Sequence, residues 1–321
     1  MMKKDTNNSC GIHKTSIGGQ AVIEGVMMRG PEKIATSVRK LDGEIVSEIK
    51  EIGKVRKNKF LKLPIIRGCV NFFDSMILGV QSLMYSAKFF DIEEEGEPEE
   101  PSKFEKWLEE KLGSEKMMNA VIYFSVILSL FFSVGLFILL PGAIGELIGR
   151  VTENRYVVTF LEGVVRITIF IAYLALVSQT KDIKRVFMYH GAEHKSINCY
   201  EHGEELTVEN VKKYTRLHPR CGTSFLLIVM VVSMLVFFFI PKIFFVYRLL
   251  LRLALLPVVA GISYEIIKYA GRHENRLTKI ISAPGMWFQH ITTREPDDSQ
   301  IEVAIVSLKA VMPESKEDDK W

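Results

Sequence analysis

Two long stretches without a charged side chain constrain the fold of this 321-residue chain more than any other feature. Met117–Gly145 contains no Asp, Glu, Lys or Arg, and Cys221–Pro241 is a second such run. About 20 apolar residues in one helix cross the hydrocarbon core of a bilayer. The sequence therefore predicts an integral membrane protein, although its overall 48% hydrophobic and 25% charged residues are ordinary for a soluble domain.

Residues 119–268 are predicted to form a mainly α-helical membrane bundle of about four spans. The expected spans are Asn119–Leu140, Tyr156–Ser178, Gly222–Ile240 and Ile243–Lys268. The histidine-rich loop 179–221 between the second and third spans carries eight lysines and arginines, whereas the turns on the opposite side carry few. Since basic loops remain on the cytosolic side, this loop and both chain termini are expected in the cytosol.

Residues 1–59 are predicted to form a small cytosolic β-subdomain. Ile34–Lys40 and Glu44–Ile49 are rich in β-branched residues and flank an Asp-Gly pair, which is typical of a hairpin turn. Glu24 and Arg29 enclose a short apolar run, and strand packing with a surface ion pair is the simpler interpretation. In the alternative, this segment lies over the histidine-rich loop as a lid or substrate strand.

The segment 60–90 is apolar but contains charges, among them Asp74 near its middle. A carboxylate inside a bilayer is costly, so an amphipathic interfacial helix is favoured over a re-entrant segment or a fifth span. An acidic linker and a polar helix, 91–118, are expected to follow. In the cytosolic tail 269–321, apolar residues within 300–312 recur with the period of one helix face, which predicts a terminal amphipathic helix docked on the protein.

Charged residues also occur inside the predicted second and fourth spans. Glu162 and Arg166 are four residues apart and share one helical face. At a rise of about 1.5 Å per residue, Glu162 and Arg252 fall at similar depth. Pairing lowers the cost of burying these charges, so a structural ion pair is the favoured interpretation and a transport pathway the alternative. Arg248 is expected to extend to the outer surface.

The most suggestive chemistry lies in the sequence His-Gly-Ala-Glu-His at residues 190–194. In a helix, His190 and His194 share one face at the spacing with which two imidazoles bind one metal ion. Glu193 would stand beside them as a general base, in the H-x-x-E-H order of the inverted zincins. A catalytic zinc site needs these neutral nitrogen ligands, an open coordination position and a nearby base.

A third ligand is expected from His218 or Glu265. Glu265 lies near the cytosolic end of the predicted fourth span, and a carboxylate completes many two-histidine zinc sites. The run His218-Pro-Arg220-Cys221 adds a His-x-x-Cys pair at metal spacing. A closed structural site of both loop histidines with His218 and Cys221 is an alternative, as is a solvated loop or one bound to lipid phosphates.

Four blocks of the sequence resemble the YqhQ-like family. They are Gly18–Gly30, His190–Lys195, His218–Thr223 and Thr292–Pro296. The resemblance implies a multi-pass protein of the bacterial inner membrane that carries the domain of unknown function 1385. Members are often described as predicted metal-dependent enzymes, and the resemblance implies no substrate.

These features predict a metal-dependent membrane enzyme of the zinc type, most simply a hydrolase that acts at the cytosolic membrane face on a peptide or a lipid phosphate ester. The competing hypothesis is a non-enzymatic membrane scaffold or assembly factor with a structural metal site, and a transporter is third. The net charge of +3, without a basic tract interleaved with aromatic residues, argues against a nucleic-acid partner. The expected partner is the lipid bilayer.

Overall fold

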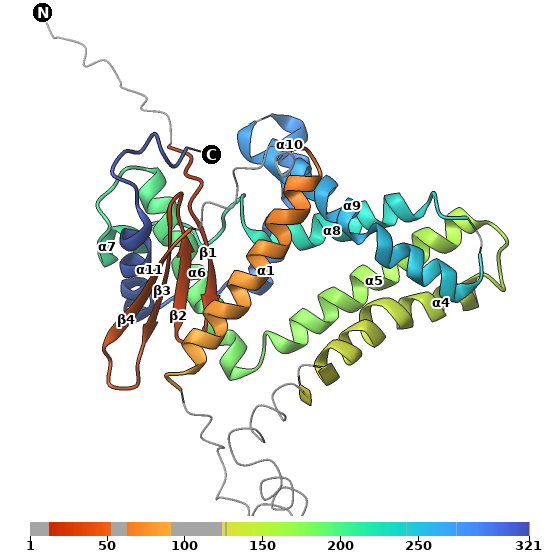
Figure 1. Ribbon diagram of the computed structural model, residues 1–321, viewed down its shortest axis with the longest axis horizontal. Helices are drawn as coiled ribbons and strands as arrows, with labels where there is room; N and C mark the ends of the chain where they lie inside the picture. Colours follow the sequence, from red (N-terminus) through yellow and green to blue (C-terminus); the bar gives the residue numbers. More distant parts are fainter. Residues whose placement is uncertain are drawn as a thin grey trace, which may run out of the picture. The chain divides into compact units, whose positions relative to one another are not determined.

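A computed structural model of the protein describes residues 13–52, 63–90, 124–125, 127–241, 243–273 and 275–320. The chain divides into two compact units, and Figure 1 traces the elements of each. The first unit comprises residues 1–89, 175–229 and 257–321, and the second comprises residues 90–174 and 230–256. The predicted linker and polar helix, 91–118, lie outside the described residues.

The predicted N-terminal β-structure is a four-stranded antiparallel sheet in the first unit. Its strands β1 (Gly18–Val22), β2 (Gly25–Arg29), β3 (Lys33–Arg39) and β4 (Ile45–Glu51) pair in chain order. The Asp-Gly pair turns the β3–β4 hairpin, where Gly43 has φ +88°, a conformation that glycine adopts without strain. β2 is buried on both faces, because helices cover both sides of the sheet.

One face of the sheet packs on α6 (Lys181–Glu201) and α11 (Asp298–Val311), and α7 (Val208–Lys212) packs on these two helices; all share one hydrophobic core. α11 begins with a capping box at Asp297, and Ile301, Ala304 and Leu308 along one face are fully buried. The predicted docking of the terminal amphipathic helix is therefore confirmed. Segments from the beginning, middle and end of the sequence together form one core.

The other face of the sheet carries α1 (Ile66–Ala87), the helix predicted within 60–90. Small residues of α1 approach the strands: Ser82 accepts a 3.2 Å hydrogen bond from Thr36, and Gly79 packs on Gln20. Large apolar side chains on α1 remain exposed, namely Phe73, Met76, Ile77, Val80, Leu83 and Met84. This division of small buried and large exposed residues is the amphipathic pattern expected of an interfacial helix.

The ion pair predicted between Glu24 and Arg29 does not form. Arg29 donates to Asp74 on α1 at 2.9 Å, so the charge in the middle of that helix faces the sheet. Glu24 instead receives the Arg185 guanidinium and, at 3.2 Å, the Tyr189 hydroxyl from α6. Both partners lie far away in the sequence. Glu24 and Arg29 therefore face different helices, α6 and α1, and do not face each other.

Three helices are long and apolar enough to cross a membrane. They are Ile127–Ile148, which contains the π-helical segment η3 (Gly135–Leu139) and α4 (Leu140–Ile148); α5 (Arg155–Val177); and Val246–Arg272 within α9 (Phe245–Arg272). The predicted third span is the shorter helix α8 (Gly222–Phe237), whose 16 residues extend about 24 Å. A bilayer core is about 30 Å thick, so three of the described helices are candidate spans and α8 is a shorter apolar helix. α10 (Arg276–Thr292) completes the first unit.

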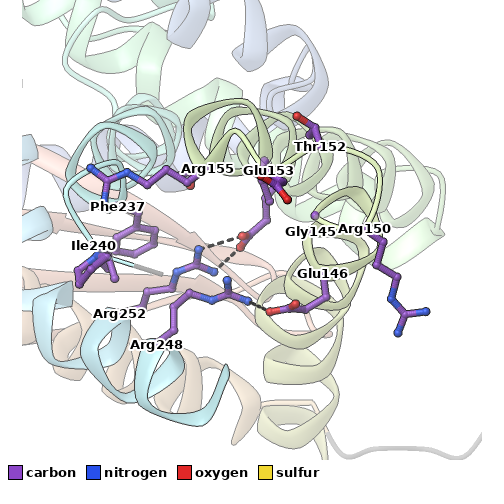
Figure 2. A pocket seen from close by; sticks show the side chains of 15 residues that line it. Gly145, Glu146, Arg150, Thr152, Glu153, Arg155, Phe237, Ile240, Arg248 and Arg252 are labelled. Atoms are coloured by element: carbon purple, nitrogen blue, oxygen red, sulfur yellow. Dashed lines mark hydrogen bonds and ion pairs between the residues drawn. The ribbon is translucent and has the colours of Figure 1, made fainter. Parts of the chain in front are cut away.

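The charges predicted inside the membrane lie together in the second unit. Glu162 on α5 accepts from Arg166 at 3.0 Å and from Arg252 on α9 at 2.9 Å. Arg248, one helical turn before Arg252, pairs with Glu146 on α4 (Figure 2). Arg248 therefore binds a carboxylate in addition to lying near the end of its helix.

Candidate metal centre

α6 places about half of the predicted histidine-rich loop, 21 of its 43 residues, in a helix. It starts after Thr180 with Asp182 in its first turn, where a negative charge stabilises the helix dipole. Every side chain from Gly191 to Glu201 is buried, although the helix is predominantly polar. Buried polar side chains are costly unless they are hydrogen-bonded, so this part of α6 is a candidate for a functional site.

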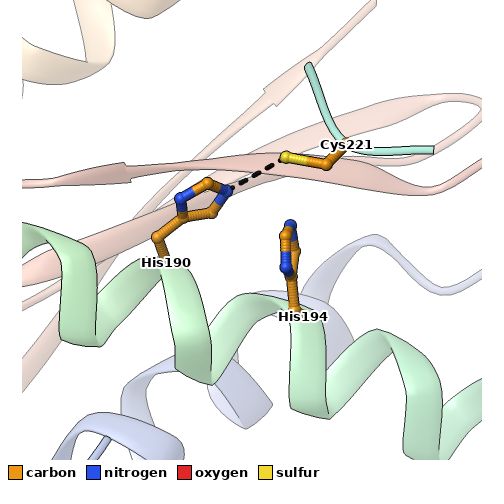
Figure 3. Close-up of side chains that lie close together, drawn as sticks. All are labelled: His190, His194 and Cys221. Carbon is orange, nitrogen blue, oxygen red and sulfur yellow. Dashed lines mark hydrogen bonds between the residues drawn. The ribbon is translucent and has the colours of Figure 1, made fainter. Parts of the chain in front are cut away.

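His190 and His194 lie on the same face of α6, and Cys221 faces them from the residue before α8 (Figure 3). The imidazole rings have centroids 4.4 Å apart, and His190 Nε2 is 3.3 Å from Cys221 Sγ. One ligand atom from each of the three residues lies within 4.8 Å of the other two. Ligands of a tetrahedral zinc ion are roughly 3.3–3.6 Å apart, so a small contraction of this group accommodates the ion.

Two backbone carbonyls orient the histidines. His190 Nδ1 lies 2.8 Å from the carbonyl oxygen of Thr292, and His194 Nδ1 lies 2.6 Å from that of Arg216. A carbonyl only accepts, so each Nδ1 carries the proton, and each Nε2 is available as a ligand. Outer-shell hydrogen bonds of this kind are a common feature of metal-binding histidines. The sequence contained no signal for Arg216, whereas Thr292 lies in a block noticed only for its resemblance.

The electrostatics of the group lower the pKa of the Cys221 thiol and raise that of the His190 imidazole. Burial raises the pKa of the Cys221 thiol, but His194 and His190 outweigh this effect and hold the pKa well below its usual range. Burial lowers the pKa of His190, and the negative charges of Cys221 and Glu193 more than reverse this, to about 9. These shifts favour a thiolate beside an imidazolium, and a metal ion would take the place of the His190 proton.

Glu193 lies beside this group without belonging to it. Its side chain is buried, and Oε2 is 3.9 Å from His190 Nε2. Within the described part of the chain, Oε2 has no hydrogen-bond partner. Burial raises the pKa of this carboxyl group above its usual value. A carboxylate with an unused oxygen and a raised pKa is suited to accept and return a proton.

β1 lies directly against Glu193, as in the alternative interpretation of the N-terminal block. A Cβ atom at Gly19 would lie 3.1 Å from Glu193 Cδ and 2.5 Å from the Met27 carbonyl oxygen. Glycine therefore permits the close approach of strand and helix. The neighbouring residue, Gln20, points to the opposite face and packs on α1, so a single strand separates α1 from Glu193.

His218 is adjacent to the group but faces other residues. Its ring centroid is 5.6 Å from that of His194, and its Nε2 lies 3.6 Å from a carboxylate oxygen of Glu201. Arg220, the other candidate in this run, forms an ion pair with the same carboxylate. Burial lowers the pKa of His218, and its backbone N–H donates to Gln289 at 2.8 Å. This arrangement supports the position of Cys221.

Glu265, the other predicted third ligand, binds an arginine instead. Its carboxylate receives both Arg67 Nε, at 2.7 Å, and an Nη of the same guanidinium. The contact forms because α1 and α9 pack closely: a Cβ at Gly68 would lie 2.7 Å from Tyr264 Cβ. The structure thus brings Cys221 to the two histidines, in the place predicted for Glu265 or His218.

The sequence is similar to known proteins over most of its length. Residues 63–314 match the family model described as "Protein of unknown function (DUF1385)". The "Uncharacterized protein YqhQ" of Bacillus subtilis (strain 168) is 36% identical over 297 residues, which cover 92% of each chain. No solved structure matches the chain. Neither description names a metal or an activity, so the metal-dependent enzyme implied by the resemblance has no support from them.

Proposed function

The chain belongs to the DUF1385 family, and we propose that it is a metal-dependent membrane hydrolase whose ion is bound by His190, His194 and Cys221. The observation that carries this proposal is the convergence of two imidazole nitrogens and one thiolate, with both histidines oriented through Nδ1. Two nitrogens and a sulfur form a donor set that suits zinc. Three protein ligands leave the fourth tetrahedral position open, as in catalytic zinc sites.

Glu193 is the proposed general base. When bound, the zinc ion would act as a Lewis acid and lower the pKa of water to about 7. Glu193 has a buried oxygen that is unpaired among the described residues, 3.9 Å from a ligand nitrogen. Its raised pKa brings proton uptake closer to neutral pH, where a general base is most effective. β1, with Gly19 against the carboxylate, limits access of bulk water on that side.

The proposed substrate is a membrane-associated peptide or a lipid phosphate ester. Cys221 directly precedes the apolar helix α8, and α1 carries a row of large exposed apolar side chains in the same unit. Both features favour a site near the membrane surface. With α8 as a short fourth span, the basic segment around α6 and both termini would be cytosolic, in a bacterial inner membrane.

A non-enzymatic scaffold with a structural metal ion is the second candidate. His218 favours it, because its ring centroid is only 5.6 Å from that of His194. Rotation of His218 away from Glu201 would supply a fourth ligand and close the site. The two candidates differ in the role of Glu193, which is dispensable for a purely structural site.

Metal analysis of the detergent-purified full chain tests the proposal. We expect about one zinc ion per chain in the wild type and loss of that ion in His190→Ala. His290→Ala is the matched control, since His290 is an exposed histidine on α10. Wild-type protein without stoichiometric metal, or equal metal content in the two variants, would refute the site.

Glu193→Gln separates the enzyme from the scaffold. The amide is nearly isosteric with the carboxylate, so the protein should accumulate normally and retain its zinc. A complementation assay in a strain that lacks the gene then reports function. Loss of complementation with retained zinc supports the enzyme, whereas full complementation favours the scaffold.

A further inference from the structure

The second unit contains a polar cavity of about 130 Å³ that the metal centre does not explain. It lies where α4 joins α5 and where α8 joins α9, at the ends of candidate membrane spans. Figure 2 shows Glu146, Phe237, Arg248 and Arg252 around it. A single water needs about 10–15 Å³ of such space, so the cavity has room for a ligand several times larger than water.

The wall of this cavity carries an excess of positive charge. Glu162, which lines the cavity, is one carboxylate shared by two guanidinium groups: that of Arg252 at 2.9 Å, also in the lining, and that of Arg166 at 3.0 Å, outside the lining. The three side chains are only 3%, 9% and 13% exposed, respectively. Arginine remains protonated in proteins, so one uncompensated positive charge lies within the helices of two candidate spans.

The hydrogen bonds of these arginines are also incomplete. The Nε atoms of Arg252 and Arg166 are buried and have no partner among the residues that the structure describes. Arg252 lines the cavity, and only 8% of this residue is exposed. A buried guanidinium with an unused donor is costly, and a bound acceptor in the cavity would reduce that cost.

The charge of the cavity selects an anion over a cation. Both carboxylates nearest the two arginines of α9 already accept ion pairs, Glu162 from Arg252 and Glu146 from Arg248. Further arginines, Arg150 and Arg155, and one further carboxylate, Glu153, also line the cavity, so its wall holds four arginines and three glutamates. A guanidinium presents a planar set of N–H donors that matches the oxygens of carboxylates and phosphates.

We propose that this cavity binds a phosphate group, with Arg252 and Arg248 as its principal donors. The group belongs either to free inorganic phosphate or to the headgroup of an anionic phospholipid that reaches the ends of the spans. Bound phosphate compensates the excess charge of the cluster formed by Glu162, Arg166 and Arg252. This cluster then forms part of an anion-binding site in addition to being a structural ion pair.

Binding of inorganic phosphate to the detergent-purified, delipidated full chain tests the proposal. We expect saturable binding in the wild type and at least tenfold weaker binding in Arg252→Gln. Arg150→Gln is the matched control: it removes the same charge at the cavity, and Figure 2 shows this side chain extending away from Arg252. Arg252→Lys keeps the charge but removes the planar donors, and it should also bind more weakly.

Two further experiments identify where the phosphate binds and whether it belongs to a lipid. His190→Ala should bind phosphate as the wild type does, which excludes phosphate bound at the metal centre. Native mass spectrometry with phosphatidylglycerol identifies the lipid source: one retained lipid that is lost in Arg252→Gln supports the site even if free phosphate does not bind. Absence of both ligands in the folded wild type, or equal weakening in Arg150→Gln and Arg252→Gln, overturns the proposal.

Discussion

Gly191→Ala is the substitution that most directly tests how the metal ligands are oriented. A Cβ atom at this position would lie 2.0 Å from the carbonyl oxygen of Arg294. Protein atoms essentially never approach a Cβ more closely than 3.0 Å, so α6 and the segment that contains Arg294 must separate by about 1 Å. That movement would stretch the hydrogen bond of His190 Nδ1 to Thr292 from 2.8 Å to about 3.8 Å, beyond hydrogen-bonding distance.

The expected result is weaker zinc binding without loss of any ligand. Removal of an outer-shell partner typically lowers metal affinity by about 10- to 100-fold, or about 1.4–2.7 kcal/mol. Competition with a chromophoric chelator measures this difference in the purified protein.

Gly222→Ala is the matched control, because Gly222 adjoins the ligand Cys221 just as Gly191 adjoins His190. A Cβ at Gly222 meets no atom of the described residues within 4 Å, so zinc affinity should stay within about twofold of the wild type. Equal zinc affinity in Gly191→Ala and Gly222→Ala would refute the role assigned to the Thr292 carbonyl.

Three further predictions concern the ligand set, its protons and the core. Cys221→Ser should abolish stoichiometric zinc binding, whereas Glu265→Gln should retain it; loss of zinc in Glu265→Gln alone would return that carboxylate to the ligand set. Because the pKa of His190 is raised to about 9, zinc must displace its proton, so affinity should fall about tenfold per unit as pH drops below 9. Calorimetry in buffers of different ionisation enthalpy would detect that proton, and pH-independent affinity would contradict it. Leu308→Ala, in the buried face of α11, should lower the free energy of unfolding by about 2–5 kcal/mol. Val306→Ala, on the exposed side of the same helix, should change it by less than about 0.5 kcal/mol. Thermal unfolding in detergent compares the two variants, and equal losses of stability would argue against docking of α11 on the protein.

Several features of this protein follow from local patterns in the sequence. Long uncharged runs indicate membrane helices because, inside a bilayer, a helix satisfies all its backbone hydrogen bonds within one segment. The β-branched residues and the Asp-Gly turn pair indicate the β3–β4 hairpin, and the single apolar face of α11 follows from the period of a helix. The same helical period places His190 and His194 on one face with Glu193 beside them. Each inference needs only residues within a few turns of one another.

The third residue of the candidate metal site depended on tertiary packing. Glu265 was a reasonable ligand by residue type, but the packing of α1 on α9 gives its carboxylate to Arg67. Cys221 becomes the partner of the histidines because α8 begins opposite α6, a contact across 31 residues of sequence. The predicted third span is observed as α8, an apolar helix of 16 residues.

The sequence by itself therefore determined which residues are able to bind a metal and which segments are apolar enough for a membrane. Only the tertiary structure decided which of those residues meet, and that Thr292 and Arg216 orient them through their carbonyls. The physical reason is that side-chain type and helical period are local properties of the chain. The identity of a partner distant in sequence depends instead on how whole helices and strands pack, which no local period encodes.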